Sequence, residues 1–530
     1  MFGKKMSGEY RTQRRTAKPQ PADMALYGVL FGSVFAFGLG PDFERAKQLC
    51  IAIAAALFAA CVQLAWHSRA ARWLVALSAL LIVASTFSLD PARAWFGSLE
   101  RSQGLLGYLP LLVIAAARVR WHHLVRAVVL SVLVLAVWAW AEHLAWPPFA
   151  PPGVARSYAS FGNPNAFAGW LIMAIPLCAA GCWSDQKSWR SFSALALLLA
   201  ISALWLSQSR AAALGLLGGL LLWYTWRARP QRRRMWARGG LSACLLAFTL
   251  WNLSSFRPDA NNERLKLWQN AWSVLTAPTP SATDPYPALR PWLGYGADHQ
   301  AALLHAADGV IADRAHNLLL DTLLQFGLLG TLGLAVLAVV ILRRCWLAPP
   351  GAESAARLVG LSAALITWQF GFPLSAELLL LTLLLSARSA EPDSLVPSEP
   401  RSSFATEANH SVRNAPNSSV RPEPVAGQQP NEQRWRIPVV IFALGLALYA
   451  YAPWPTLPLA RTPERAYQQF KAGTQAYQRA DYRQAVKHFA FAQQLDPLRA
   501  DYRAARATAQ RMQARKQVFP APQRSVAPTP

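Results

Sequence analysis

Residues 318–342 read LLLDTLLQFGLLGTLGLAVLAVVIL, an apolar run that contains one charged side chain, Asp321. An α-helix rises 1.5 Å per residue, so this run reaches about 37 Å, which is more than the roughly 30 Å of hydrocarbon in a bilayer. The sequence therefore predicts a membrane-spanning helix here, and this prediction decides the fold class.

Similar apolar runs recur along the chain. They cover residues 24–40, 49–66, 73–88, 104–117, 124–141, 166–183, 192–208, 211–226, 239–253, 357–372, 374–387 and 437–452. With 318–342 they predict an all-α polytopic membrane protein of about 12–13 transmembrane helices. The composition agrees, because 53% of the 530 residues are hydrophobic and only 15% are charged. A soluble protein of this length carries far more surface charge.

The basic residues are placed as orienting charges. The net charge of +25 would favour nucleic-acid binding in a soluble chain, but here the basic residues form short clusters between apolar runs, and we expect no nucleic-acid partner. With the N-terminus inside, the strongest clusters share one side of the membrane, as the positive-inside rule requires. They are Arg69 and Arg72, then Arg118, Arg120 and Arg126, then Lys187 and Arg190, the arginines within 227–238, and Arg343 with Arg344.

This alternation divides the chain into segments. Residues 1–23 are a basic cytoplasmic N-terminus, and no convincing cleavage site follows, so the first apolar run is interpreted as an uncleaved span. Residues 24–387 form the membrane domain, with a long outer loop at 254–317. Residues 388–435 are rich in Pro, Ser, Asn and Glu and predict a disordered cytoplasmic linker. The last span, 437–452, then carries the tail to the outside.

Residues 461–515 show the pattern of a tetratricopeptide repeat. The pattern consists of Ala466, Gly473, Tyr482, Ala485, Phe489, Ala492 and Pro497. Small residues let two antiparallel helices approach, and aromatic residues fill the groove between them. One and a half repeats cannot bury a full core, so we expect this tail to pack on a protein partner or on the membrane domain. An unrelated helical hairpin is the alternative interpretation.

No metal or cofactor is expected. The six cysteines lie almost entirely within apolar runs and have no metal-ligand spacing, so they are interpreted as small buried thiols. The outer-loop histidines His299, His305 and His316 also match no standard metal site.

Arg210 is a candidate phosphate-binding residue. It follows Ser207-Gln208-Ser209 between two apolar runs, on the outer side, where the positive-inside rule does not call for a cation. A fixed arginine at the outer leaflet is suited to holding a lipid-linked phosphate by bidentate hydrogen bonds. The alternative is an arginine at a helix end whose charged group extends to the interface.

His316 is a candidate general base. It stands at the outer mouth of an apolar helix, next to Asn317, and a neutral imidazole can accept a proton from a sugar hydroxyl near pH 7. The alternative is an ordinary polar residue at a helix end. Asn163 and Asn165 lie in a turn that opens the helix after 166, and on composition alone they predict only capping.

Taken in order, five segments resemble the O-antigen ligase and polymerase family, which includes bacterial protein O-oligosaccharyltransferases. The segments are Arg156 with Phe161-Gly162-Asn163-Pro164-Asn165-Ala166, Ser209-Arg210, Arg264 with Trp268 and Ala271, Leu293-Gly294-Tyr295-Gly296, and Ala315-His316-Asn317 with Leu320 and Gly327-Leu328-Leu329-Gly330. The resemblance covers about residues 90–390. Members with tetratricopeptide tails are similar to the whole chain.

The resemblance implies transfer of a glycan from undecaprenyl diphosphate to an acceptor hydroxyl at the periplasmic face of the bacterial inner membrane. It assigns the catalytic base to His316 and diphosphate binding to Arg210 and Arg264. Supporting roles fall to Arg156, Asn163, Asn165, Gly294, Gly296 and Asn317. The chain departs from the family in a long proline-rich stretch between Trp272 and Gly294, and in lacking an aromatic residue soon after Gly296.

Three acceptors are compatible with the resemblance: a lipid A-core sugar, a growing glycan chain, and a serine or threonine of a secreted protein. An O-antigen ligase is the favoured assignment. Two other classes remain as alternatives, a transporter of lipid-linked glycans and a non-catalytic scaffold. A transporter usually shows internal repeats and interrupted helices near the midplane. No internal symmetry is evident here, and the polar groups gather at one face. A scaffold predicts that His316 and Arg210 are dispensable while the tail is not.

Overall fold

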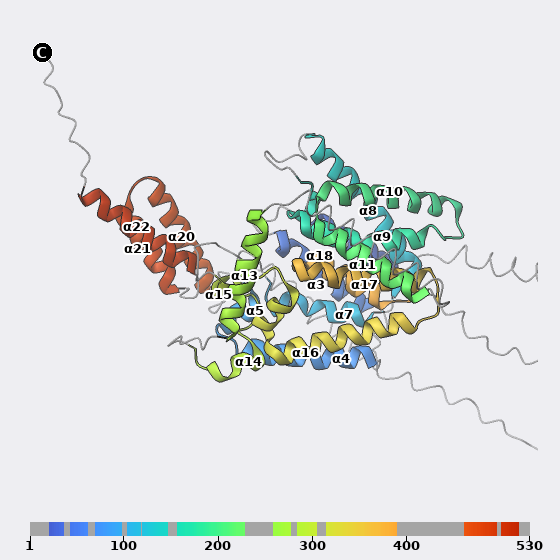
Figure 1. Cartoon of the computed structure of the whole chain (residues 1–530), viewed down its shortest axis with the longest axis horizontal. Helices are drawn as coiled ribbons and strands as arrows, with labels where there is room; N and C mark the ends of the chain where they lie inside the picture. Colours follow the sequence, from blue (N-terminus) through green and yellow to red (C-terminus); the bar gives the residue numbers. More distant parts are fainter. Residues whose placement is uncertain are drawn as a thin grey trace, which may run out of the picture.

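The computed structural model describes residues 21–36, 43–61, 69–97, 103–117, 119–146, 156–227, 258–276, 284–304, 314–388, 461–495 and 500–518. The predicted spans 239–253 and 437–452, nearly all of the predicted linker 388–435, and His305 lie outside these ranges. The described chain is almost wholly helical (Figure 1). Its strands are two residues each, β1 (Val119–Arg120) paired in parallel with β2 (Ala387–Arg388). The all-α class is confirmed.

The helices before the long outer loop are α2 (Pro21–Phe35), α3 (Phe43–Cys61), α4 (Arg69–Thr86), α5 (Pro91–Phe96), α6 (Leu105–Tyr108), α7 (Pro110–Ala116), α8 (Trp121–His143), η1 (Ala159–Phe161), α9 (Pro164–Gly181), α10 (Lys187–Ser207) and α11 (Arg210–Arg227). The predicted run 104–117 is thus two short helices, and Pro110 begins the second, where its missing N–H costs nothing.

The loop and the helices after it are α13 (Pro258–Thr276), η2 (Pro287–Leu289), α14 (Arg290–Leu293), α15 (Gln300–Leu304), α16 (Leu318–Leu347), α17 (Ala352–Thr367), η3 (Trp368–Phe370) and α18 (Ser375–Ser386). The tail contains α20 (Arg461–Gln478), α21 (Tyr482–Leu495) and α22 (Ala500–Val518).

Four helices of the described part are long and apolar enough to span a membrane: α8, α9, α10 and α16. Five shorter apolar helices accompany them. On α10 and α16 large apolar side chains face outward, such as Trp205 at 75% exposure and Val339 at 62%. A continuous exposed apolar surface of this kind suits lipid better than water. The chain is therefore an all-α protein associated with a membrane.

α9 lies at the centre of the helical bundle (Figure 1). It packs against α8, α10, α11, α17 and α18. Its side chains are apolar on every face, and Trp170, Phe167 and Met173 are fully buried. α9 is thus enclosed by its neighbours, and those helices begin or end near its two ends.

α16 is kinked at Gly327, which has φ 60° and ψ −164° inside the helix. Because of the kink, the backbone carbonyls of the preceding turn lose their usual N–H donors within the helix. The backbone N–H of Tyr295 donates to the Leu324 carbonyl at 2.8 Å, and that of Gly296 to the Gln325 carbonyl at 2.9 Å. The long outer loop is therefore hydrogen-bonded into the break in α16.

The loop has its own small hydrophobic core. Ala271, Tyr295, Leu304, Ala315 and Leu324 are buried together and join α13, α15 and the start of α16. The segment predicted as an outer loop is thus partly folded onto the bundle.

The tail helices pack as consecutive antiparallel pairs, α20 with α21 and α21 with α22. The small residues Ala466, Ala485 and Ala492 are fully buried, and a Cβ on Gly473 would lie 2.6 Å from the Phe489 ring. Phe470 lies between the rings of Phe489 and Tyr502. Three helices lie within the predicted tail, and Pro497 of the repeat pattern lies outside the described residues.

Candidate functional site

The end of the bundle at which α9, α11 and α16 begin gathers most of the predicted site residues. Asn163 caps α9 and accepts a hydrogen bond from the Asn165 backbone N–H at 2.8 Å. α17 ends here as well, since the Thr367 hydroxyl donates to the Ala211 carbonyl at 3.3 Å. Residues from four separate stretches of the sequence thus meet at one end of the fold.

Asn165 ties the turn before Arg210 to the start of α9. Its side-chain oxygen accepts one hydrogen bond from the Arg156 guanidinium at 3.0 Å and another from the Ser209 hydroxyl at 3.1 Å. Arg156 also donates to the Ser207 carbonyl at 2.8 Å. The predicted supporting residues therefore hold the turn that presents Arg210.

His316 has a strained backbone that is fixed on both sides. Its φ is 53°, which a non-glycine residue rarely adopts. Before it, the Ala315 carbonyl accepts from the Trp268 indole at 3.0 Å, and the Ala315 N–H donates to Asp321 at 2.9 Å. After it, Asn317 caps α16 and donates to the Gln369 carbonyl at 3.1 Å. These contacts impose the conformation that positions the ring.

The His316 ring lines a small pocket together with Asn163, Asn165, Phe372 and Glu377. The ring centroid lies 5.3 Å from that of Phe372. About 20 Å³ of the pocket is open to water, which is room for roughly one water molecule. The pocket thus joins the predicted base to the two asparagines, about 150 residues earlier in the chain.

Arg264 and Arg210 lie close enough to interact electrostatically. Both side chains are half-buried. Burial lowers the pKa of Arg264, and the positive charge of Arg210 lowers it further. Trp268, which bonds to Ala315, is one helical turn after Arg264 and therefore shares its face of α13. The two arginines predicted to bind one anion are brought together beside the His316 segment.

Arg314 is a site residue that the sequence prediction missed. It is only 6% exposed, and its guanidinium carbon lies 4.8 Å from the centroid of the Phe372 ring. Phe372 thus contacts both Arg314 and His316. The position of Arg314, two residues before His316, was the one sequence feature that could have indicated its place in the site. Nothing in the sequence connected Arg314 or His316 to Phe372.

A buried group of charged side chains lies beneath the pocket, and it was also missed. Glu377 accepts from the Trp368 indole at 3.1 Å and from the Leu374 N–H at 2.8 Å. Glu44 accepts from the Ser375 N–H at 2.8 Å, and the Lys47 ammonium lies 4.3 Å from the Phe161 ring centroid.

Glu44, Lys47 and Glu377 are at most 3% exposed, and the first two act electrostatically on Glu377. Opposite charges buried together at this depth offset one another's cost and fix the helices that carry them.

Gly294 and Gly296 lie at the kink in α16, not in the His316 pocket. Both have positive φ, 73° and 107°. A Cβ on Gly294 would lie 2.5 Å from the Gln325 carbonyl carbon, and one on Gly296 would lie 2.3 Å from the Ser88 Cβ. Their role in the described structure is to let the loop approach α16.

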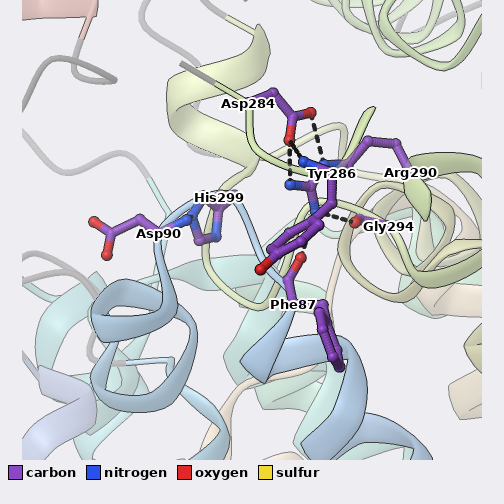
Figure 2. Close-up of polar contacts among 7 residues, drawn as sticks. All are labelled: Phe87, Asp90, Asp284, Tyr286, Arg290, Gly294 and His299. Carbon is purple, nitrogen blue, oxygen red and sulfur yellow. Dashed lines mark hydrogen bonds and ion pairs between the residues drawn. The ribbon is translucent and has the colours of Figure 1, made fainter. Parts of the chain in front are cut away.

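A second polar cluster holds the same loop (Figure 2). The Arg290 guanidinium donates to both carboxylate oxygens of Asp284, at 2.8 and 2.5 Å, and to the Phe87 and Gly294 carbonyls at 2.7 and 3.2 Å. The Arg290 guanidinium holds the pKa of Asp284 below its usual range. This buried pair connects the loop to the end of α4.

His299 has a structural role. Its Nε2 accepts from the Asp90 N–H at 3.1 Å (Figure 2). Its Nδ1 lies 2.9 Å from the Ala297 carbonyl. A ring with one acceptor and one donor nitrogen is neutral. Burial, assisted by the charge of Arg93, lowers the pKa of His299 to about 4. Within the described residues no three metal-ligating side chains come together.

No protein-family model matches the chain, and no curated protein matches it either. The four cysteines whose side chains are described are free thiols, buried or half-buried, as the sequence predicts.

Proposed function

We propose that the protein transfers a glycan from undecaprenyl diphosphate to an acceptor hydroxyl. One observation carries the proposal: Arg210 and Arg264 lie beside the segment that holds His316. Two like charges repel unless an anion lies between them, and a diphosphate offers oxygens to both guanidinium groups.

The proposed reaction balances without a metal. The acceptor oxygen attacks the anomeric carbon, the bond from that carbon to the diphosphate oxygen breaks, and the acceptor proton passes to His316. The lipid diphosphate leaves as an anion, whose charge Arg210 and Arg264 stabilise. Asn165 and Arg156 position the Arg210 turn, while Glu377 and Phe372 shape the pocket around the imidazole.

The same proposal includes the placement of the chain. We place it in a bacterial inner membrane with about 12–13 spans, the N-terminus in the cytoplasm, and the His316 pocket and the tail in the periplasm. The fixed turn and the folded outer loop then lie at the periplasmic face, where a lipid-linked donor presents its diphosphate.

The test is the fate of the lipid-linked glycan in a deletion strain that expresses wild type, His316→Ala or His143→Ala. His143 is an exposed histidine at the end of α8 and serves as the matched control. We expect His316→Ala, at normal abundance, to lose transfer by at least about a hundredfold while His143→Ala retains it. Full activity of His316→Ala would refute the proposal.

The acceptor is identified by what accumulates. Long polymer on undecaprenyl diphosphate with bare lipid A-core identifies a ligase, which we favour. Single repeat units on the core identify a polymerase, and loss of one glycoprotein identifies a protein transferase. If none of these changes, the scaffold or transporter class replaces the enzyme.

A further inference from the structure

A larger pocket lies at the opposite end of the helical bundle from His316. It is formed where α8, α10 and α17 begin and α9 ends, and its volume is about 340 Å³. That volume falls in the range of pockets that hold small molecules. No residue of the proposed transfer site lines it.

The lining is amphipathic. Val125, Ala180 and Gly181 form apolar wall between α8 and α9, whereas Arg126 and Asp185 stand at the polar rim. Walls of this kind accept a hydrocarbon chain, and the rim accepts a charged head group. The pocket therefore favours an amphiphile over a water-soluble metabolite.

The Arg126 side chain is held in place by two contacts. Its guanidinium donates to the Gln186 side chain at 2.9 Å, and its central carbon lies 4.9 Å from the Trp189 ring centroid. One hydrogen bond leaves further N–H groups of this five-donor fork available. The geometry presents a pre-oriented cation at the pocket rim.

Asp185 supplies the opposite charge. It is exposed, and within the described residues it forms no ion pair with Arg126. The other acidic residue of the pocket, Glu353, is already paired with Arg357. Arg126 and Asp185 thus remain as separated charges of opposite sign.

Tryptophans surround this rim. Trp121, Trp183 and Trp189 all line the pocket, and 81% of the Trp183 surface is exposed. Tryptophan is enriched where helices meet the membrane–water interface, at the depth of lipid head groups. The position of the pocket at the ends of α8, α9 and α10, three helices able to span a membrane, agrees.

We propose that this pocket binds a zwitterionic phospholipid with an ethanolamine head group. The lipid phosphate accepts hydrogen bonds from Arg126, the ammonium pairs with the Asp185 carboxylate and the Trp183 ring, and an acyl chain follows the apolar wall. A head group with both charges matches the separated pair, and the ethanolamine ammonium, unlike choline, has N–H donors for the Asp185 carboxylate. An anionic lipid would leave Asp185 opposed to its own charge.

The experiment is native mass spectrometry of the delipidated full-length protein titrated with phosphatidylethanolamine, phosphatidylcholine or phosphatidylglycerol. We expect one tightly bound phosphatidylethanolamine per chain. Arg126→Gln and Asp185→Asn should each weaken it by about tenfold or more, as expected for loss of a charge-assisted contact. Lys187→Gln, an exposed change at the same end of the bundle, is the matched control.

Trp183→Ala removes an exposed side chain and keeps the test informative if Arg126→Gln fails to fold. Equal binding of all three lipids, or unchanged binding in Asp185→Asn and Trp183→Ala, would overturn the proposal. Glycan transfer by the same variants is measured in parallel. Lipid binding is independent of that activity, so either proposal can fail alone.

Discussion

Lowering the pH from about 7.5 to about 5 should loosen the outer loop through His299. This imidazole is buried and neutral, and its pKa is lowered to about 4. In the unfolded loop the pKa of a histidine is about 6.5. The unfolded loop therefore binds a proton that the folded loop refuses, and acidification favours unfolding.

The magnitude follows from the two pKa values. The stabilisation is complete above about pH 6.5 and declines, as the pH falls towards about 4, by about 1.4 kcal/mol per pH unit. At about pH 5 the loss is therefore about 2 kcal/mol. Charges facing the ring are Arg93, Asp90 and Asp298. The Asp284–Arg290 pair should stay ionised, because the pKa of Asp284 is held below its usual range.

The assay is hydrogen exchange of peptides covering 290–300 in wild type and His299→Gln, compared at each pH. Glutamine keeps an acceptor near the Asp90 N–H but cannot take up the proton. We expect wild type to lose protection by about thirtyfold between the two pH values, and the variant to lose much less. An equal loss in both proteins would refute the interpretation of His299 as a buried neutral ring.

Three further predictions concern the His316 end of the bundle. Arg264→Lys keeps the positive charge but loses the bidentate guanidinium, so the apparent affinity for the lipid-diphosphate donor should fall by about tenfold. The control is Lys266→Ala, on another face of α13, which should leave this affinity unchanged. Asn165→Ala removes the acceptor shared by Arg156 and Ser209, and transfer should fall by about tenfold at normal abundance because the Arg210 turn loosens; normal transfer would contradict this. Gly169→Ala would place a Cβ 2.0 Å from the Glu377 Oε1, so thermal unfolding should show a destabilisation of about 1–3 kcal/mol. In the control Gly28→Ala, the added Cβ has no atom within 4 Å, and the change should be neutral or slightly stabilising.

The positions of the helices could be predicted where an apolar run determines them. The start of α16 after Asn317 follows from an apolar run and a capping residue. Its kink at Gly327 did not follow, because a glycine breaks a helix only when another segment takes up the freed carbonyls. Those partners, the N–H groups of Tyr295 and Gly296, come from a loop about 30 residues away.

The candidate site was predictable where the family resemblance grouped distant residues, and not where membership depends on tertiary contacts alone. The resemblance grouped His316 with Asn163 and Asn165, and all three line one pocket. Gly294 and Gly296, which it also treated as site residues, lie at the kink in α16 and do not line this pocket. Glu377 was overlooked because a single carboxylate in an apolar run shows neither its partner Trp368 nor the space left by Gly169.

Because His316 has a positive φ, the presence of a histidine at this position lowers the stability of the fold. A left-handed conformation costs a non-glycine residue about 1–2 kcal/mol, and asparagine or glycine tolerates it better. A library of this chain sorted only for heat resistance should therefore enrich His316→Asn and His316→Gly. The most durable clones would lack the imidazole, so engineering for robustness must exclude this position from randomisation.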